Sequence, residues 1–258
     1  MKKAWLTARS LMLWAISGAH FGIVCTFLVL LGFFVDPRKN DRSQRIFFRN
    51  ILRLAGVRFE VRRAPGFDAK RTSIFVCNHV NIFDPFVIYS AIPQFVRGFE
   101  LESHFKVPIY GWMMGRFGNV PVPDSRSREG LERMTRKAKE ALDSGVSLIA
   151  FAEGSRTRDG HVQEFHKGVF RLAQKFGTPI VPMSIAGSYE FFQTGNWMLH
   201  PGKITVYLHD TIDTAQVERA NVDQLAKQVR SIVAAPVEES LKCVYTIGHA
   251  GKGKQSEA

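Results

Sequence analysis

The pattern of hydrophobic and polar positions divides the chain into an apolar start and a longer mixed part. Residues 10–35 contain no Lys, Arg, Asp or Glu. As a helix this stretch would be about 39 Å long, enough to cross a bilayer core of about 30 Å. We predict a membrane segment that is retained in the mature protein. A buried core helix and a secretory signal peptide are the alternatives, but the run is longer than a signal-peptide core and lacks a small-residue cleavage site.

The next segment, residues 38–55, is predicted to be a basic amphipathic helix. Its arginines recur at spacings of three or four and share one helical side opposite apolar residues; they are Arg38, Arg42, Arg45, Arg49 and Arg53. Such a helix lies in the headgroup layer of a membrane, and an ordinary surface helix packed on the domain is the alternative. The apolar run either spans the membrane or enters it as a hairpin. Because basic residues are denser after the run, a spanning run predicts a cytoplasmic catalytic domain.

From residue 57 onward, strand patterns alternate with helix patterns. Strands are expected at 57–61, 73–77, 95–101, 119–123, 146–151, 179–185 and 203–209, and helices from 84, then at 108–117, 127–144, 167–176 and 221–243, with Pro236 interrupting the last. This order is typical of an α/β fold with a mixed, largely parallel sheet flanked by helices. We therefore predict a membrane-attaching part at 1–56, one catalytic domain at 57–245 and a disordered tail at 246–258.

Composition and charge narrow the classes of partner. The chain has 258 residues, of which 45% are hydrophobic, which excludes a mini-protein that needs disulfide staples and a disordered chain of low hydrophobicity. Its net charge is +12, and most of the excess precedes residue 64. That distribution favours a membrane surface over nucleic acid as the anionic partner. Three cysteines without motif spacing, and histidines without metal spacing, predict neither a disulfide framework nor a metal site.

A histidine and an aspartate follow the second predicted strand. His79 would lie at the carboxyl end of the strand at 73–77, where α/β sheets bind ligands. Asp84 stands at the start of the next predicted helix and is followed by Pro85. If the turn folds back, the Asp84 carboxylate can orient the imidazole and leave its other nitrogen as a base for a substrate hydroxyl. The alternative is that these are ordinary polar loop residues and that Asp84 only caps the N-terminus of the helix.

A second polar turn follows the strand at 146–151. Gly154 permits a tight turn, and the planar fork of Arg156 matches a phosphate group. Glu153 leaves an apolar strand, where an unpaired carboxylate would be costly, so we expect it to pair with an arginine or with backbone N–H groups. A polar turn with a surface arginine is the alternative. Ser155 is not expected to be a nucleophile because the chain has no G-x-S-x-G motif.

Taken together, these motifs resemble those of the glycerolipid acyltransferases, in particular the 1-acylglycerol-3-phosphate acyltransferases. The resemblance covers about residues 40–210 and rests on N-H-x-x-x-x-D at Asn78–Asp84, K-x-P-x-x-G at Lys106–Gly111, E-G-S-R at Glu153–Arg156, a segment resembling F-K-x-G at Phe165–Gly168 and a V-P strand at Ile180–Ile185. The chain departs from the pattern at Ala152, where proline is usual, and at Ser155, where threonine is usual. The family pattern has an arginine at the position where this chain has Pro123-Asp124. The next arginines along the chain are Arg126 and Arg128.

The resemblance implies transfer of a fatty acyl group from acyl-CoA or acyl-carrier protein to the free hydroxyl of 1-acylglycerol-3-phosphate, giving phosphatidic acid. It implies that His79 is the base and that Asp84 orients it. It further implies that Arg156, with Lys106, binds the acceptor's phosphate and that Glu153, Gly154 and Ser155 form the substrate-binding turn. No cofactor is expected. The alternatives are another lysolipid or glycerol 3-phosphate as acceptor, or a non-catalytic membrane lipid-binding protein.

Overall fold

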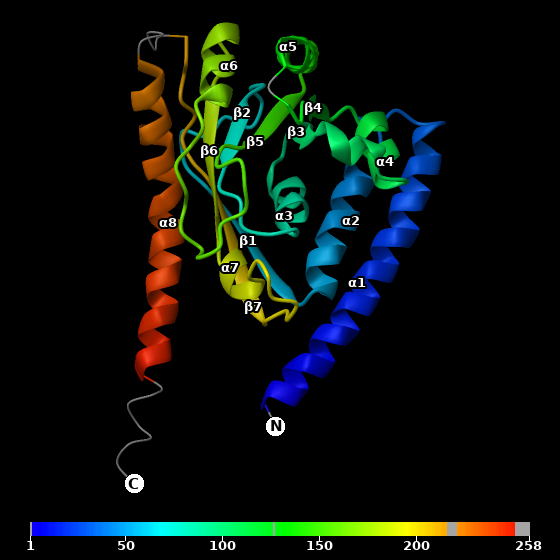
Figure 1. Ribbon diagram of the computed structural model, residues 1–258, viewed down its shortest axis with the longest axis vertical. Coiled ribbons are helices and arrows are strands. Elements are labelled where there is room, and N and C mark those ends of the chain that lie inside the picture. Colours follow the sequence, from blue (N-terminus) through cyan, green and yellow to red (C-terminus); the bar gives the residue numbers. More distant parts are fainter. Residues whose placement is uncertain (1, 126, 216–220, 251–258) are drawn as a thin grey trace.

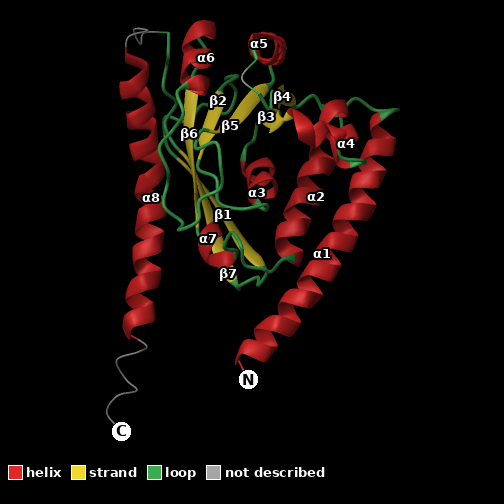
Figure 2. Ribbon diagram, in the orientation of Figure 1, coloured by secondary structure: helices red, strands yellow, loops and turns green. Residues whose placement is uncertain are grey.

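The computed structural model describes residues 2–125, 127–215 and 221–250 (Figure 1). Within this part of the chain, strands form one sheet with helices on both faces (Figure 2). The strands are β1 Val57–Arg63, β2 Ile74–Cys77, β3 Val96–Leu101, β4 Val120–Val122, β5 Ser147–Phe151, β6 Ile180–Ala186 and β7 Gly202–Leu208. The predicted α/β fold with a mixed sheet is confirmed.

The order of the strands decides which loops meet. The sheet has the order β1-β7-β6-β2-β5-β3-β4, and of its neighbouring pairs only β6 and β7 run antiparallel. Because β2, β5 and β3 are adjacent and parallel, their carboxyl ends lie at one edge of the sheet. The segments that follow Cys77, Phe151 and Leu101 therefore emerge side by side.

One face of the sheet is covered by α5 Arg128–Asp143, α6 Gly168–Phe176 and α8 Val222–Ala250. Pro236 lies inside α8 and does not interrupt it, contrary to the sequence prediction. A proline removes the hydrogen bond to the carbonyl four residues before it, which here belongs to Ile232. The adjacent carbonyl of Val233 accepts from the hydroxyl of Ser184 at 2.8 Å, which ties α8 to β6 beside the proline. Because α8 extends to Ala250, it covers the start of the predicted tail, and 251–258 lie outside the described residues.

The other face is covered by α1 Lys2–Gly32, α2 Asp41–Leu54 and α3 Asp84–Ala91. The remaining elements are the 3-10 helix η1 Glu102–Lys106, α4 Tyr110–Arg116 and α7 Ser188–Phe191. α1 is long and apolar enough to cross a membrane, and an 18-residue stretch within it has a mean hydropathy of 1.9. One side of it is packed on the protein through Leu13, Cys25, Leu28 and Val29. Its opposite side exposes apolar residues, namely Trp5, Leu11, Met12, Ile16, Ile23, Phe27 and Leu30.

α2 is a helix where the arginine spacing predicts one, but its apolar side lies in the protein core rather than at a lipid surface. Phe47, Ile51 and Leu52 are buried in the cluster that joins α1, α2 and the sheet. The alternative of a helix packed on the domain therefore holds for this side of α2. The reason is that α1 and α3 supply enough apolar area to cover it.

Some of the arginines on the basic side of α2 donate hydrogen bonds to backbone carbonyls of the protein. Arg45 donates to the carbonyls of Ile92 and Gln94 and forms an ion pair with Asp41 at 2.6 Å. These carbonyls follow the end of α3, where helical backbone acceptors have no helical partner. Arg42 and Arg53 remain exposed.

Candidate active site

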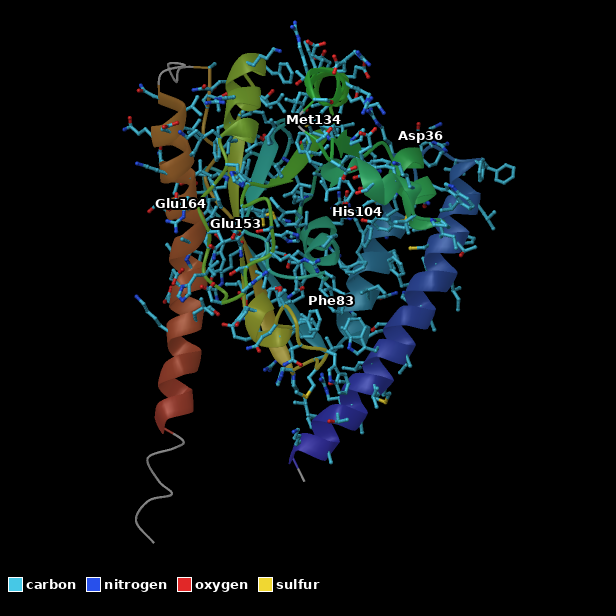
Figure 3. All side chains as sticks on the ribbon, viewed as in Figure 1. Asp36, Phe83, His104, Met134, Glu153 and Glu164 are labelled. Atoms are coloured by element: carbon cyan, nitrogen blue, oxygen red, sulfur yellow. The ribbon has the colours of Figure 1, made fainter. Side chains whose placement is uncertain are left out.

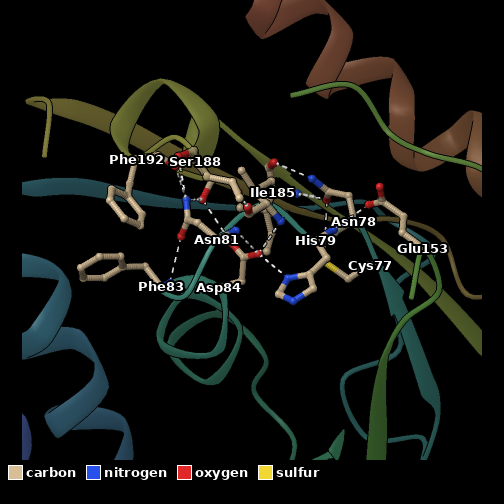
Figure 4. A network of polar contacts seen from close by, with 12 residues as sticks. Cys77, Asn78, His79, Asn81, Phe83, Asp84, Glu153, Ile185, Ser188 and Phe192 are labelled. Atoms are coloured by element: carbon tan, nitrogen blue, oxygen red, sulfur yellow. Dashed lines mark hydrogen bonds and ion pairs between the residues drawn. The ribbon is translucent and has the colours of Figure 1, made fainter. Parts of the chain in front are cut away.

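The candidate site begins at the carboxyl end of β2, where His79 faces Asp84 (Figure 4). The distance from His79 Nδ1 to Asp84 Oδ2 is 2.8 Å. Asp84 is completely buried, whereas 21% of the His79 side chain is exposed. A carboxylate only accepts hydrogen bonds, so Nδ1 carries the proton and Nε2 of a neutral imidazole is a free acceptor.

Asp84 is not the N-cap of α3, contrary to the alternative reading of its sequence position. Phe83 occupies that position, and Asp84 is the first residue of the helix. Its carboxylate instead turns back to the preceding loop, where Oδ2 accepts from the backbone N–H groups of Val80 at 2.6 Å and Asn81 at 2.9 Å. The loop therefore closes on the carboxylate, which brings His79 and Asp84 together.

Two side chains without a predicted role support Asp84 from the other side: Ser188 contacts it, and the Asn81 amide holds Ser188. The hydroxyl of Ser188, at the start of α7, donates to Asp84 Oδ1 at 3.1 Å. The amide of Asn81 donates to the carbonyls of Ser188 and Phe192, each at 2.9 Å. Ser188 is 104 residues from Asp84, and no local pattern indicates this contact. Asn81 lies inside the N-H-x-x-x-x-D motif, so a polar residue at this position could have indicated a structural role in the site.

Asn78 joins the site to the neighbouring strand. Its amide nitrogen donates to the Ile185 carbonyl at 3.0 Å, and its amide oxygen accepts from the Ile185 N–H at 2.8 Å. The side chain thus continues the pairing of β2 with β6 beyond the end of β2. This pairing holds the backbone at the residue that precedes His79.

Glu153 links the two motif segments through backbone groups. Its Oε1 accepts from the His79 N–H at 2.7 Å, and its Oε2 accepts from the Gln163 N–H at 2.8 Å. Burial raises the pKa of the Glu153 carboxyl, while these two N–H groups act in the opposite direction. In addition, the Thr157 N–H donates to the His79 carbonyl at 2.9 Å. Both peptide groups of His79 are therefore held by the turn that follows β5.

Aromatic and apolar side chains surround the histidine. Phe151, the last residue of β5, stacks on the His79 ring with centroids 3.9 Å apart. Phe83, which is labelled in Figure 3, lies near α1. It packs between Trp14 of α1 and Phe191 of α7, with centroid distances of 5.7 and 5.1 Å. The motif loop therefore lies directly against the long N-terminal helix.

Cys77 lies two residues before His79 but is unsuited to nucleophilic attack. It is completely buried. Burial, followed by the charges of Asp84 and Glu153, raises the pKa of the Cys77 thiol well above its usual value. The reactive form of a cysteine is the thiolate, so this thiol stays neutral and unreactive.

The other predicted site residues lie at the same edge of the sheet. Gly154 has a φ of 73°, and a Cβ there would approach the His166 ring to 2.8 Å, so glycine suits the turn. Ser155 and Arg156 are exposed after it. Lys106 ends η1, which follows β3, and is also exposed. No side-chain hydrogen bond or ion pair joins Arg156 or Lys106 to another residue in the described ranges.

The structure also bears on the arginines near the out-of-register position. Arg128 begins α5 and pairs with Glu132 at 2.9 Å on an exposed surface. Arg126 lies outside the described residues. The turn that carries Arg156 is held from the other side by Arg230 of α8, which donates to the carbonyls of Gln163 and Val162 at 2.9 and 2.8 Å. Among the residues that the structure describes, no group of three or more His, Cys, Asp or Glu could hold a metal ion.

Known proteins resemble this chain in sequence and in fold. A family model described as Acyltransferase matches residues 58–186, half of the chain. The chain belongs to this acyltransferase family. The matched residues of the acyltransferase begin in β1 and end with β6, so they include His79, Asp84 and the Glu153–Arg156 turn.

Relatives of this acyltransferase come from plants and bacteria. The chain is 29% identical over 167 residues to the chloroplastic 1-acyl-sn-glycerol-3-phosphate acyltransferase LPAT1 of Arabidopsis thaliana, covering 64% of this chain and 45% of that protein. It is 24% identical over 233 residues to the enzyme of the same name from Escherichia coli, covering 89% of this chain and 94% of that protein. The chain spans about half the length of the plant relatives it matches.

A solved structure resembles the acyltransferase over most of its length. This is the 1-acyl-sn-glycerophosphate acyltransferase PlsC of Thermotoga maritima, with a TM-score of 0.77 and 25% identity. The match covers 93% of this chain and 97% of that one. The similarity therefore includes the N-terminal helices as well as the sheet.

Proposed function

We propose that this acyltransferase moves a fatty acyl group from acyl-CoA or acyl-carrier protein to the free hydroxyl of 1-acylglycerol-3-phosphate, giving phosphatidic acid. The observation that carries the proposal is the His79–Asp84 pair, with Nδ1 bonded to the buried carboxylate and Nε2 left as an acceptor. The names of the relatives favour the same acceptor. Another lysolipid or glycerol 3-phosphate is the second candidate for the acceptor.

In the proposed mechanism His79 acts as general base. Nε2 takes the proton from the acceptor hydroxyl as the oxygen attacks the thioester carbonyl. The tetrahedral intermediate collapses, the C–S bond breaks, and the leaving thiolate takes the proton from the imidazolium. Asp84 stabilises the positive charge that the ring carries between these steps and keeps its orientation.

Acyl transfer is proposed to be direct, without an acyl-enzyme. Cys77, the nucleophilic side chain nearest to His79 in sequence, is buried and neutral at physiological pH. The His79 ring is partly exposed and is proposed to meet the substrates directly. Both substrates are therefore bound together when the transfer takes place.

The acceptor's phosphate is proposed to bind Arg156 with help from Lys106. Arg156 follows β5 and Lys106 follows β3, and these strands are neighbours whose carboxyl ends lie at the same edge as His79. Neighbouring strands are about 4.8 Å apart, and each cation lies five residues beyond the end of its strand. The proposal requires both long side chains to turn toward one phosphate. Glu153, Gly154 and Ser155 complete the turn that presents Arg156.

The proposal places the enzyme on the cytoplasmic face of a membrane. The exposed side of α1 carries large apolar residues from Trp5 to Leu30, and an apolar surface of this length is typical of membrane contact. Because the opposite side of α1 is packed on the protein, the helix is proposed to lie along the membrane rather than to span it. The donor and acceptor would then reach the site from the bilayer.

The test is an assay of the purified full-length enzyme with an array of lysolipid acceptors and acyl donors, read by mass spectrometry. We expect phosphatidic acid to form from 1-acylglycerol-3-phosphate and the release of free CoA or carrier protein to require the acceptor. Transfer to a different acceptor alone would overturn the assigned substrate. Lipid binding without any release of the donor thiol would overturn the enzymatic function.

A further inference from the structure

The segment that runs from the end of β3 through α4 exposes apolar side chains that have no role in the proposed chemistry. Val107, Ile109 and Trp112 are 46%, 44% and 64% exposed. Three large apolar residues within six positions form an unusual surface for contact with water. Their segment starts at the carboxyl end of β3, which lies at the same edge of the sheet as His79.

The backbone of this segment is strained in a way that holds Ile109 outward. Ile109 has φ 65° and ψ −58°, and the Tyr110 N–H donates to the Pro108 carbonyl at 2.7 Å. These values describe a γ-turn of the rare, strained form. In the described part of the chain Ile109 alone has a positive φ without being glycine. The strain is not offset by burial of its side chain, which points to a role outside the free protein.

The segment also needs Gly111 at its centre. A Cβ at this position would lie 2.1 Å from the carbonyl oxygen of Phe105, so any other residue would force the turn open. Met113 is buried on the inner side of α4, whereas Trp112 is on its outer side. The turn and the helix together therefore present Ile109 and Trp112 as a fixed apolar surface.

The helix α4 that carries this surface packs against the exposed end of α1. The Cγ of Arg116, in the last turn of α4, lies 3.1 Å from where a Cβ of Gly32 would be, so α4 packs closely on α1 (Figure 1). The residues that directly follow Gly32 are Phe33 and Phe34, which are 73% and 88% exposed. Two apolar elements from distant parts of the sequence therefore meet at one place.

The charges around the surface suit an anionic lipid layer. Lys106 and Arg116 flank it and are exposed. Between Glu102 and Asp124 the chain has no acidic residue. Basic residues beside exposed apolar side chains are typical of segments that enter the headgroup layer of a membrane.

We propose that residues 106–116 form a second membrane contact beside α1, with Ile109 and Trp112 placed at the boundary between headgroups and acyl chains. The contact rests on the membrane association in the proposed function and extends it. Its position at the end of β3 would bring the bilayer to the sheet edge that carries His79. Lipid substrates would then reach the site without leaving the membrane surface.

The first test compares Trp112→Asp with Leu131→Asp in the full-length protein. Leu131 is a matched control because it is 43% exposed but lies on α5, on the other face of the sheet. We expect Trp112→Asp to weaken binding to vesicles of phosphatidylcholine and phosphatidylglycerol by about tenfold or more, as lost burial of an aromatic ring implies. Leu131→Asp should bind like the wild type. Equal binding by both variants and the wild type would overturn the proposal.

A second variant separates membrane contact from folding. Ile109→Gly should raise the thermal stability of the protein, because glycine adopts this backbone conformation without strain. At the same time it should weaken vesicle binding. A variant that is more stable and binds vesicles as well as the wild type would show that Ile109 does not contact the membrane.

Activity with two forms of acceptor distinguishes this inference from the proposed function. The Trp112→Asp variant should lose transfer to long-chain acceptor in vesicles but retain it with a short-chain acceptor dissolved below its micelle concentration. If the wild type transfers to neither acceptor, the proposed function fails. If the wild type is active and the variant matches it on both acceptors, only the second membrane contact fails.

Discussion

The base and the cations of the candidate site are held in different ways. Asp84 accepts four hydrogen bonds, from His79, Val80, Asn81 and Ser188, and it is completely buried. The side chains of Arg156 and Lys106 are exposed and have no hydrogen bond or ion pair with another described residue. A proton transfer needs a fixed geometry before the substrate arrives, whereas a long cationic side chain can close on a phosphate when it binds. Substitutions in the two regions should therefore affect different kinetic constants.

The largest effect is expected at the base. His79→Ala should lower kcat by about 10³-fold, because loss of a general base commonly costs about 10² to 10⁴. His161→Ala is the matched control, since His161 pairs with Glu238 at 2.7 Å on the surface. Kinetics with saturating acceptor would measure both variants. Near-normal turnover by a folded His79→Ala protein would contradict the mechanism.

Glu153→Gln tests whether the turn after β5 supports the base. Glutamine has one acceptor oxygen, so it cannot satisfy both the His79 and the Gln163 N–H groups. The unsatisfied group costs about 1–3 kcal/mol, and we expect kcat to fall by about tenfold or more. An unchanged kcat would mean that the backbone of His79 holds its position without Glu153.

The same substitution has a pH dependence with a definite sign. Because burial raises the pKa of Glu153 in the folded protein, its contribution to stability is fully present below the unfolded value and is lost as pH rises through the folded value. The free energy of unfolding of the wild type, relative to Glu153→Gln, should therefore be larger near pH 4.5 than at pH 8. Urea unfolding in detergent at the two pH values measures this difference. A difference that grows with pH would contradict the assigned direction.

Arg156→Ala should chiefly raise the KM for the acceptor. A hydrogen bond to a charged group is worth about 1.5–3 kcal/mol, which corresponds to a rise of about tenfold or more. Arg158→Ala is the neighbouring control, because Arg158 is also exposed. The KM for an acceptor that lacks the phosphate should not change. Equal effects with both acceptors would remove the phosphate role from Arg156.

Ser188→Ala should lower kcat by about five- to tenfold and leave both KM values unchanged, since a buried acceptor without its partner costs about 1–3 kcal/mol. The cause is that Asp84 Oδ1 loses its donor and the carboxylate can rotate. Ser184→Ala is the control, because Ser184 is equally buried but bonds to Val233 and His209. If both variants lost kcat equally, the effect would come from folding and not from Asp84.

The smallest effect is expected at Cys77. A buried cysteine behaves as a small hydrophobic residue, so Cys77→Ala should change kcat by no more than about twofold. Steady-state kinetics would measure this, and mass spectrometry should find no acylated Cys77 when the donor is present alone. A loss comparable to that of His79→Ala would favour an acyl-cysteine intermediate over direct transfer.

Local patterns predicted the elements that depend on nearby residues. Ser127 is the N-cap of α5, where its hydroxyl accepts from the Gly130 N–H, and Gly177 ends α6 in the left-handed conformation. These features follow from contacts within a few positions. Patterns failed where a distant element intervened. The apolar side of α2 is covered by α1 and α3, and α8 continues through Pro236 while it packs on the sheet.

The spacing of His79 and Asp84 was readable in the sequence because one loop can close between residues five apart. The role of Ser188 was not, because it requires β6 to lie beside β2. The exposure of Ile109 and Trp112 could not be predicted from the sequence either, since apolar residues at these positions fit a buried helix equally well. Only the packing of α4 shows which of its side chains remain outside.

The sequence by itself therefore determined the order of the strands and of the longer helices, though not η1 or α7. It also determined the apolar character of α1 and the residue types of the base, its carboxylate and the candidate phosphate ligands. Those properties depend on periodicity and on spacing within one loop. The tertiary structure decided that β5 lies next to β2, so that Glu153 reaches the backbone of His79, and that Ser188 reaches Asp84. Strand order and helix packing arise from contacts among residues far apart in the chain, and local sequence patterns do not encode them.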